Sequence, residues 1–278
     1  MKGKAVMDYW ICTTCGTQFA QSETPPQACP ICSDKRQYIG YEGQQWTTLA
    51  ALQAGNFHNV FKEYEPHLTG IGTEPSFAIG QRALLLQTDQ GNVLWDCISY
   101  LDGDTVAAIQ QRGGLKAIAI SHPHFYTTMV EWAEQFDAPI YLHEANRQWV
   151  MRPSERITFW PGEALSLLDD VTLVRLGGHF SGSAVLHCSG GADGKGILLT
   201  GDTIQVVTDR TWVSFMYSFP NLIPLPASEI RRIRDGIAPY SFERLYGMRF
   251  ESVVATDAKN VVLRSAERYM RALEERLK

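Results

Sequence analysis

Histidine and aspartate side chains that could bind a metal ion follow three short apolar runs in the middle of the chain. Neutral imidazole nitrogens and carboxylate oxygens suit zinc or iron, and a His-x-His pair that leaves a strand can place two nitrogens on one ion. We therefore predict one metal centre, with the aspartate either as a fourth ligand or as a hydrogen-bond partner of the metal's water. The predicted set is His122, His124, His179 and Asp202.

A second candidate metal site lies near the N-terminus. Cys12, Cys15, Cys29 and Cys32 have the spacing Cys-x2-Cys-x13-Cys-x2-Cys. Four thiolates at this spacing predict tetrahedral coordination of zinc or of a single iron, in a compartment where thiols stay reduced. A closed site of this kind leaves no position for substrate, which favours a structural role. An iron centre that passes electrons is the alternative.

The elements that must position these residues alternate along the chain from residue 82 onward. Apolar periodicity predicts strands and helices in an order typical of mixed sheets between helices. The expected strands are 83–86, 93–97, 116–120, 140–142, 164–168, 171–176, 184–188, 197–200, 244–246 and 252–255. The expected helices are 104–112, 127–136, 228–237 and 258–277.

The segment before residue 81 has a different character. Residues 1–40 hold the four cysteines and are too short to bury a core, so metal binding must hold them together. Residues 41–80 contain several glycines and prolines, including Gly70 and Gly72, and predict no regular element. We expect a four-cysteine module at 1–40, a connector packed on the main domain at 41–80, and the main domain at 81–278.

The composition of the chain argues against several classes of function. The chain has 278 residues, of which 45% are hydrophobic and 20% charged, values ordinary for a globular protein. A formal charge of −5 argues against binding to a nucleic acid backbone. No apolar run predicts a signal peptide or membrane span, and no glycine-rich motif predicts a nucleotide cofactor. We expect a cytoplasmic protein that acts on a small molecule.

From residue 83 to the C-terminus the motifs resemble the metallo-β-lactamase superfamily. That family carries His-x-His-x-Asp-His, a later lone His, a later Asp and a final His. His122 and His124 match its first pair, His179 its lone His and Asp202 its later Asp, while Asp96 resembles its first, supporting Asp. The resemblance implies an αββα sandwich. Similarly, about 25 residues around the four cysteines resemble a rubredoxin-like knuckle.

Departures from the family pattern affect a second metal. Tyr126 and Thr127 stand where the family has the Asp and His of its first motif, and Asp257 stands where we expect its final His. The second half of a two-metal site is therefore missing. We expect a single ion, with Asp257 either as the N-cap of the last helix or as a remnant ligand.

A single zinc with an open position would lower the pKa of bound water to about 7 and support hydrolysis of an ester, lactone, thioester or amide. We expect Asp202 to accept the water's proton and Tyr126 to assist the oxyanion or the leaving group. Two alternatives remain: an iron oxygenase fed by a rubredoxin-like centre, and a metabolite-binding relative without catalysis.

For the remaining histidines, cysteines and aromatic residues we expect positions in the core, on the surface or at the pocket. His143 follows a strand and either lines the pocket or lies outside it, whereas three other histidines read as ordinary surface or core residues. These are His58, His67 and His187. Cys97 and Cys188 read as small buried residues. The aromatic stretch 212–226 predicts an apolar wall for the substrate, a packed core segment or a homodimer contact.

Overall fold

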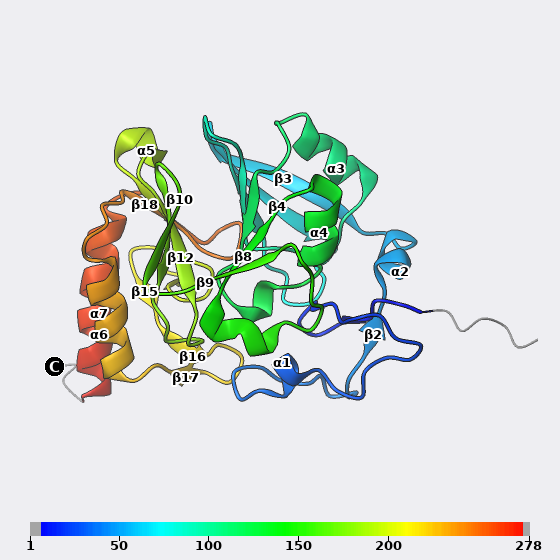
Figure 1. Cartoon of the computed structure of the whole chain (residues 1–278). Helices are drawn as coiled ribbons and strands as arrows, with labels where there is room; N and C mark the ends of the chain where they lie inside the picture. Colours follow the sequence, from blue (N-terminus) through cyan, green and yellow to red (C-terminus); the bar gives the residue numbers. More distant parts are fainter. Residues whose placement is uncertain (1–6, 275–278) are drawn as a thin grey trace, which may run out of the picture.

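A computed structural model describes residues 7–274 and has two β-sheets packed face to face, with helices on both outer faces. Figure 1 shows α6 and α7 side by side along one sheet and α3 and α4 against the other. This is the αββα sandwich expected from the sequence.

The first sheet has seven strands in the order β3-β4-β5-β6-β7-β8-β9. Its first four strands are antiparallel, and β6 to β9 run parallel to one another. The strands are β3 (His58–Glu65), β4 (Leu68–Glu74), β5 (Ala83–Leu86), β6 (Val93–Trp95), β7 (Ala117–Ala119), β8 (Ile140–His143) and β9 (Ile157–Trp160). Helical segments near this sheet are α3 (Gly103–Gln110), η1 (Pro123–Phe125), α4 (Met129–Phe136) and η2 (Glu144–Trp149).

The second sheet has six strands in the order β10-β11-β12-β13-β18-β19. They are β10 (Ala164–Leu168), β11 (Val171–Arg175), β12 (Ala184–Cys188), β13 (Ile197–Leu199), β18 (Arg244–Tyr246) and β19 (Val253–Val254). Its helices are α6 (Ala227–Ile237) and α7 (Ala258–Leu273), and α5 (Gly191–Gly194) is a short turn between β12 and β13. Two hairpins lie between β13 and α6: β14 (Gln205–Val206) with β15 (Val213–Ser214), and β16 (Met216–Ser218) with β17 (Ile223–Pro224).

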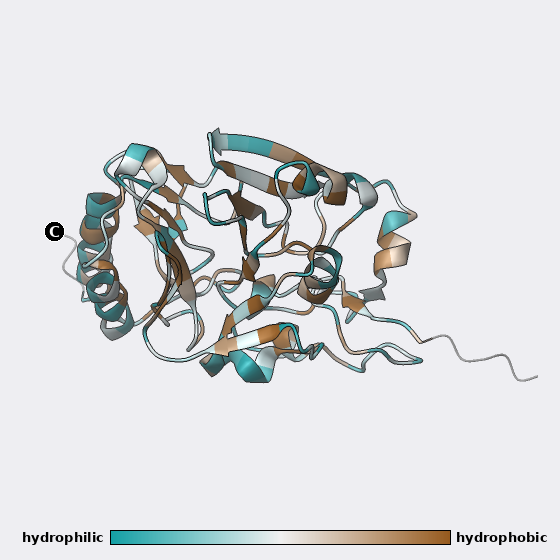
Figure 2. Cartoon of the chain, turned by 45° about the horizontal axis from the view of Figure 1, so that its top comes forward, coloured by the Kyte–Doolittle hydropathy of each residue, from teal (hydrophilic) through white to brown (hydrophobic). Residues whose placement is uncertain are grey.

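Three apolar cores hold the layers together. The central core joins the inner faces of the two sheets, with Leu84 and Trp95 from one and Leu173 and Leu199 from the other. A second core packs α3 and α4 on the first sheet, and a third packs α6 and α7 on the second. Figure 2 shows hydrophobic residues concentrated in the strands, while the helices at its left edge mix hydrophobic and hydrophilic residues. Such amphipathic helices bury one face and leave the other in water.

The expected elements after residue 82 all form, with ends that differ by a few residues. The last helix, expected to reach residue 277, continues to Leu273, and its final expected residues lie outside the described range. The segment 41–80 differs from expectation because β3 and β4 extend the first sheet, and β4 pairs with β5 across residue 80. The division at residues 40 and 80 stays a prediction.

The N-terminal segment lies against the main sandwich (Figure 1). It has β1 (Ile11–Cys12), α1 (Pro30–Ser33), β2 (Trp46–Thr47) and α2 (Leu49–Gln53). The four cysteines are buried together, with Phe19 and Ile31 in the same small core. Within residues 7–274 no helix has the length and apolar character that a membrane crossing requires.

Candidate metal centre

The strands that carry the four predicted ligands end at one edge of the sandwich. In the first sheet β6 and β7 are parallel, so their following residues emerge together. In the second sheet β11 and β13 are both antiparallel to β12 and therefore share a direction, which brings their following residues to one edge. His122 and His124 follow β7, His179 follows β11, and Asp202 follows β13.

Four side chains meet at this edge. One ligand atom from each of His122, His124, His179 and Asp202 lies within 4.8 Å of the other three. His179 Nε2 is 3.2 Å from His124 Nδ1, and His122 Nε2 is 3.6 Å from Asp202 Oδ2. Ligand atoms about 3.3 Å apart are expected around a tetrahedral zinc with bonds of about 2.0 Å. The arrangement therefore fits one metal ion.

Hydrogen bonds orient the rings toward the centre. His179 Nδ1–H donates to the Met216 carbonyl at 3.3 Å, which leaves Nε2 to face His124. His122 Nδ1 lies 2.8 Å from Ser121 Oγ, which leaves its Nε2 to face Asp202. The carbonyl partner fixes the tautomer of neutral His179 and leaves its Nε2 unprotonated. The Ser121 hydroxyl can donate or accept, so it orients the His122 ring without fixing its tautomer.

Burial keeps His124 and His179 neutral. His122, His124, His179 and Asp202 are each no more than 5% exposed. Burial lowers the pKa of His179 to about 3 and that of His124 well below its ordinary value, helped by the neighbouring imidazoles. His122 Nε2, His124 Nε2 and Asp202 Oδ1 have no hydrogen-bond partner among the described residues. Buried polar atoms without partners are costly, and a cation at the point where the four side chains meet would satisfy His122 Nε2, which faces Asp202 Oδ2.

Asp96 supports the centre from behind, as the family resemblance implies. Its carboxylate accepts the Ser121 N–H at 2.8 Å, and the Ser121 hydroxyl in turn contacts His122. Burial raises the pKa of Asp96 to about 6, an effect that the neighbouring His122 partly offsets. Gly201, with φ of +52°, packs against the same serine, since a Cβ at Gly201 would lie 2.4 Å from Ser121 Oγ. Asp96, Ser121 and Gly201 therefore set the positions of two ligand-bearing loops.

The two family positions that differ in this chain provide no ligands for a second ion. Tyr126 is buried in the core beneath α4, and neither its hydroxyl nor Thr127 Oγ1 has a hydrogen-bond partner among the described residues. Burial raises the pKa of the Tyr126 phenol, and the nearby Asn146 side chain opposes this weakly. Within residues 7–274 the groups that could hold a metal are the His–Asp cluster and the four cysteines.

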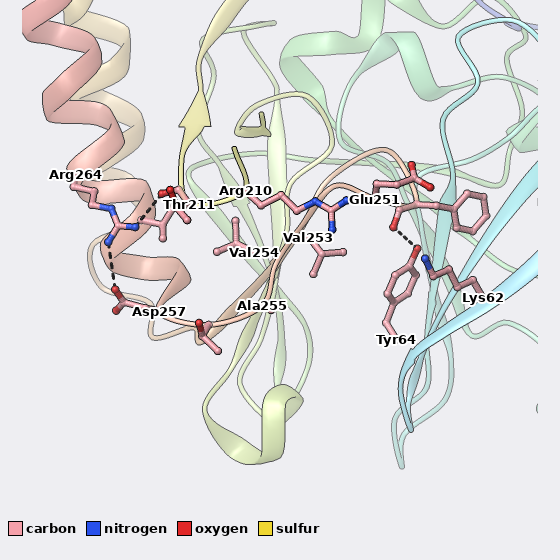
Figure 3. Close-up of a pocket in the computed structure, with 13 residues that line it drawn as sticks. Lys62, Tyr64, Arg210, Thr211, Glu251, Val253, Val254, Ala255, Asp257 and Arg264 are labelled. Carbon is pink, nitrogen blue, oxygen red and sulfur yellow. Dashed lines mark hydrogen bonds and ion pairs between the residues drawn. The ribbon is translucent and has the colours of Figure 1, made fainter. Parts of the chain in front are cut away.

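Asp257 does not reach the centre. Because β19 runs antiparallel to β18, it carries Asp257 toward the opposite edge of the sheet. Asp257 occupies the N-cap position of α7, yet its carboxylate makes no capping bond and instead pairs with Arg264 at 3.5 Å. Figure 3 shows both residues at a separate cavity of about 700 Å³. The strand end beside Asp202 is that of β18, which is followed by Gly247 and Met248.

The other histidines and cysteines lie outside the centre. His143 is buried, donates Nε2–H to the Gly162 carbonyl at 2.9 Å and accepts the Ala145 N–H at Nδ1, so both its nitrogens are used. The group of four ligands includes none of His58, His67 and His187. Cys97 and Cys188 are buried, as expected, and burial raises their pKa values to about 12 and about 11.

The four N-terminal cysteines also have the spacing of a metal site. Cys12 Sγ lies 3.6 Å from Cys32 Sγ, and Cys15 Sγ lies 3.7 Å from Cys29 Sγ. About 3.8 Å is expected between sulfurs on a tetrahedral zinc with bonds of about 2.3 Å, and a disulfide is far shorter. Their mutual hydrogen bonds lower the pKa of Cys12 and raise that of Cys15 and Cys32, so a thiolate at Cys12 is favoured over a thiolate at either of the other two.

Aromatic side chains and one arginine cover the His–Asp cluster. We call Arg36, Trp149, Phe180, Tyr217 and Phe219 the site cover. The aromatic stretch contributes in two ways: Phe215 is buried in the core, whereas Phe219 lies 5.8 Å from the His179 ring. Sequence reasoning missed Arg36 and Phe180. Phe180 directly follows His179, so its position beside the cluster could have been predicted. No sequence pattern relates Arg36 to the cluster, because the strands that carry the cluster are distant from it in the chain.

The fold resembles that of solved metallo-β-lactamases. The fold resembles VMB-1 with a TM-score of 0.58 and 13% identity, over 79% of this chain and all of that one. It resembles DIM-1 with a TM-score of 0.57 and 15% identity, over 76% and 97%. For FIM-1 from Pseudomonas aeruginosa, in its mono-zinc form, the TM-score is 0.54 at 14% identity, over 76% and 96%. The chain therefore has the metallo-β-lactamase fold, with a four-cysteine cluster added at its N-terminus.

Sequence comparison finds a relative with much higher identity than these solved structures. The chain is 56% identical over 272 residues to the uncharacterized protein YmaE of Bacillus subtilis (strain 168), a match that covers 98% of this chain and 99% of that protein. The chain belongs to the family of YmaE. No family model matches the sequence.

Proposed function

We propose that this protein is a hydrolase with one catalytic metal ion, which acts on an ester, lactone or thioester of a small molecule. The observation that carries the proposal is the buried convergence of three imidazoles and one carboxylate within 4.8 Å, without ligands for a second ion among the described residues. A zinc ion held there would lower the pKa of a coordinated water to about 7 and polarise a carbonyl oxygen.

The chain's own residues would then have separate roles in the reaction. Asp202 has one carboxylate oxygen facing His122 and a second, Oδ1, without a partner among the described residues, so Oδ1 accepts the proton of the attacking water. Tyr126 donates its unpartnered hydroxyl to the oxyanion or to the leaving group. The aromatic rings of the site cover exclude bulk water and provide an apolar wall.

The four-cysteine cluster has a structural role in this proposal. Its sulfurs are all buried and hydrogen-bonded to one another or to Thr17 and Gln44, so no position faces a substrate. A bound zinc or iron would hold together a segment whose own apolar core is small.

Hydrolysis is tested with protein reconstituted with zinc and assayed against a panel of esters, lactones and thioesters. We expect turnover of at least one class, and we expect His179→Ala to lose both the ion of the His–Asp centre and the activity. His187→Ala is the matched control because His187 is a buried histidine outside the cluster. Binding of panel compounds without turnover would support the non-catalytic alternative and contradict the proposal.

An iron oxygenase is the second candidate, and the presence of a four-thiolate cluster in the same chain favours it. The metal content of protein purified without added metal separates the two. Zinc and no colour agree with hydrolysis. Three results together would contradict hydrolysis and support the oxygenase. They are iron in the His–Asp centre, a visible thiolate absorption band from the cysteines, and consumption of oxygen.

A further inference from the structure

The loop that follows the fourth cysteine lies against the segment that orients His179. Ser218 Oγ donates to the Arg36 carbonyl at 2.9 Å, and Asn221 Nδ2 donates to the Lys35 and Gln37 carbonyls at 3.3 Å. Two residues before Ser218, the Met216 carbonyl accepts the hydrogen bond from His179. The four-cysteine module is thereby fixed beside the metal centre.

The Arg36 side chain extends from this loop to the aromatic rings beside the centre. Its guanidinium carbon lies 4.2 Å from the centre of the Phe180 ring and 5.0 Å from that of Tyr217. The Phe180 ring also lies 4.9 Å from the His124 ring, in an edge-to-face arrangement. One aromatic ring therefore contacts both the Arg36 guanidinium and a residue of the His–Asp cluster.

Only part of the guanidinium is used within the protein. Arg36 Nη1 donates to Asp34 Oδ1 at 2.7 Å, while Nε is buried and has no partner among the described residues. No described residue accepts a hydrogen bond from Nη2 either. The edge formed by Nε and Nη2 presents two parallel donors, the geometry that binds a carboxylate with two hydrogen bonds.

We propose that Arg36 recognises a carboxylate group of the substrate, so that the four-cysteine module forms part of the substrate site. This inference rests on the hydrolase proposal and deepens it by naming the substrate class: an ester, lactone or thioester that also carries a free carboxylate. The metal ligands bind the reacting carbonyl end, and Arg36 binds the carboxylate across the Phe180 ring. Arg36 is a specificity residue here and does not take part in bond breaking.

Binding of small thiols to the zinc-loaded protein tests the proposal without any substrate. A thiol can occupy the open position of zinc. The probes are mercaptoacetate, 3-mercaptopropionate and 4-mercaptobutyrate, each compared by calorimetry with its uncharged amide. We expect at least one acid to bind about tenfold more tightly than its amide, as two charge-assisted hydrogen bonds imply. Arg36→Met should abolish this preference, and Arg36→Lys, which lacks the fork, should retain only part of it.

Controls separate recognition from folding. Arg156→Met removes an arginine that pairs with Asp137 and makes no contact with the site cover, so the acid preference should persist. Each variant should keep its full metal content and its circular dichroism spectrum. If wild type and Arg36→Met prefer the acids over the amides equally, or if wild type prefers no acid over its amide, the proposed role of Arg36 is wrong. The hydrolase proposal is unaffected by either result. Failure of acids and amides alike to bind would contradict the open metal site, and the carboxylate proposal with it.

Discussion

The orientation of His122 depends on a chain of hydrogen bonds that involves no ion. Asp96 accepts the Ser121 N–H, and the Ser121 hydroxyl contacts the His122 ring. The first bond joins the end of β7 to the end of β6, and the second lies within the loop after β7, so the position of the ring depends on the pairing of these two strands. Such partners preorganise a metal site and reduce the reorganisation that binding requires.

Gly201→Ala tests this support. A methyl group at Gly201 would meet the Ser121 side chain at 2.4 to 2.7 Å, so we expect overpacking to destabilise the fold by about 1 to 3 kcal/mol beyond the backbone strain and to weaken metal binding. Gly114→Ala is the control, because Gly114 also has positive φ, at +70°, but nothing lies within 4 Å of a Cβ there. Urea unfolding and zinc affinity are the measurements. Equal effects in the two variants would show that strain alone matters.

Tyr126→Phe tests the catalytic role of the phenol. Because the hydroxyl is buried without a partner among the described residues, its removal should leave the free energy of unfolding nearly unchanged or slightly higher. If it assists the oxyanion or the leaving group, kcat should fall about tenfold or more with metal content intact. An unchanged kcat would remove Tyr126 from the mechanism and leave it a core residue.

At the scale of elements, the sequence predicts the sandwich well because its strands are short, apolar and each followed by a turn. The four candidate metal-binding residues could be assigned to one sheet edge for the same reason, since each lies a few residues after a strand. The extra strands β3 and β4 were not assigned because the glycines and prolines in and beside them, including Gly70, Gly72 and Pro66, read as breaks. Gly70 and Gly72 instead make room for aromatic rings, as a Cβ at Gly72 would lie 2.4 Å from the Phe250 ring.

Asp257 illustrates what a linear pattern cannot supply. Its position after a β-rich run matched the expected final strand end, yet only the pairing of β18 with β13 reveals which strand end lies beside Asp202. Strand direction within a sheet is decided by contacts distant in sequence. The position of Arg36 depends on the same kind of contact, between the loop after Cys32 and the segment around Ser218.

The two metal sites are built from different elements and should load separately. We expect Cys29→Ser to reduce the metal content by one ion per chain and to lower the thermal midpoint, because the N-terminal segment has little core of its own. The His–Asp centre should retain its ion. Cys188→Ser, at a buried cysteine outside both clusters, is the control for the loss of a thiol. Loss of both ions in Cys29→Ser would show that the sites depend on each other.

For the molecule as a whole, buried neutral histidines link stability to pH. Burial lowers the pKa of His187 below its ordinary value of 6.5, while Nε2–H donates to the Ser241 carbonyl at 2.7 Å. The unfolded chain therefore binds more protons than the folded one, and stability is present above about pH 6.5 and declines as pH falls below it. His187→Gln should show a shallower decline in urea midpoint between pH 7 and pH 5 than wild type. An identical pH dependence would contradict the assigned shift.

The whole account depends on one cation among His122, His124, His179 and Asp202, and anomalous diffraction from metal-replete crystals tests this most directly. We predict a single anomalous peak at this edge of the sandwich, in contact with His122 Nε2, His124 Nδ1 and His179 Nε2, and a separate peak among the four cysteines. Two peaks in the His–Asp centre, or none in metal-replete protein, would contradict the account.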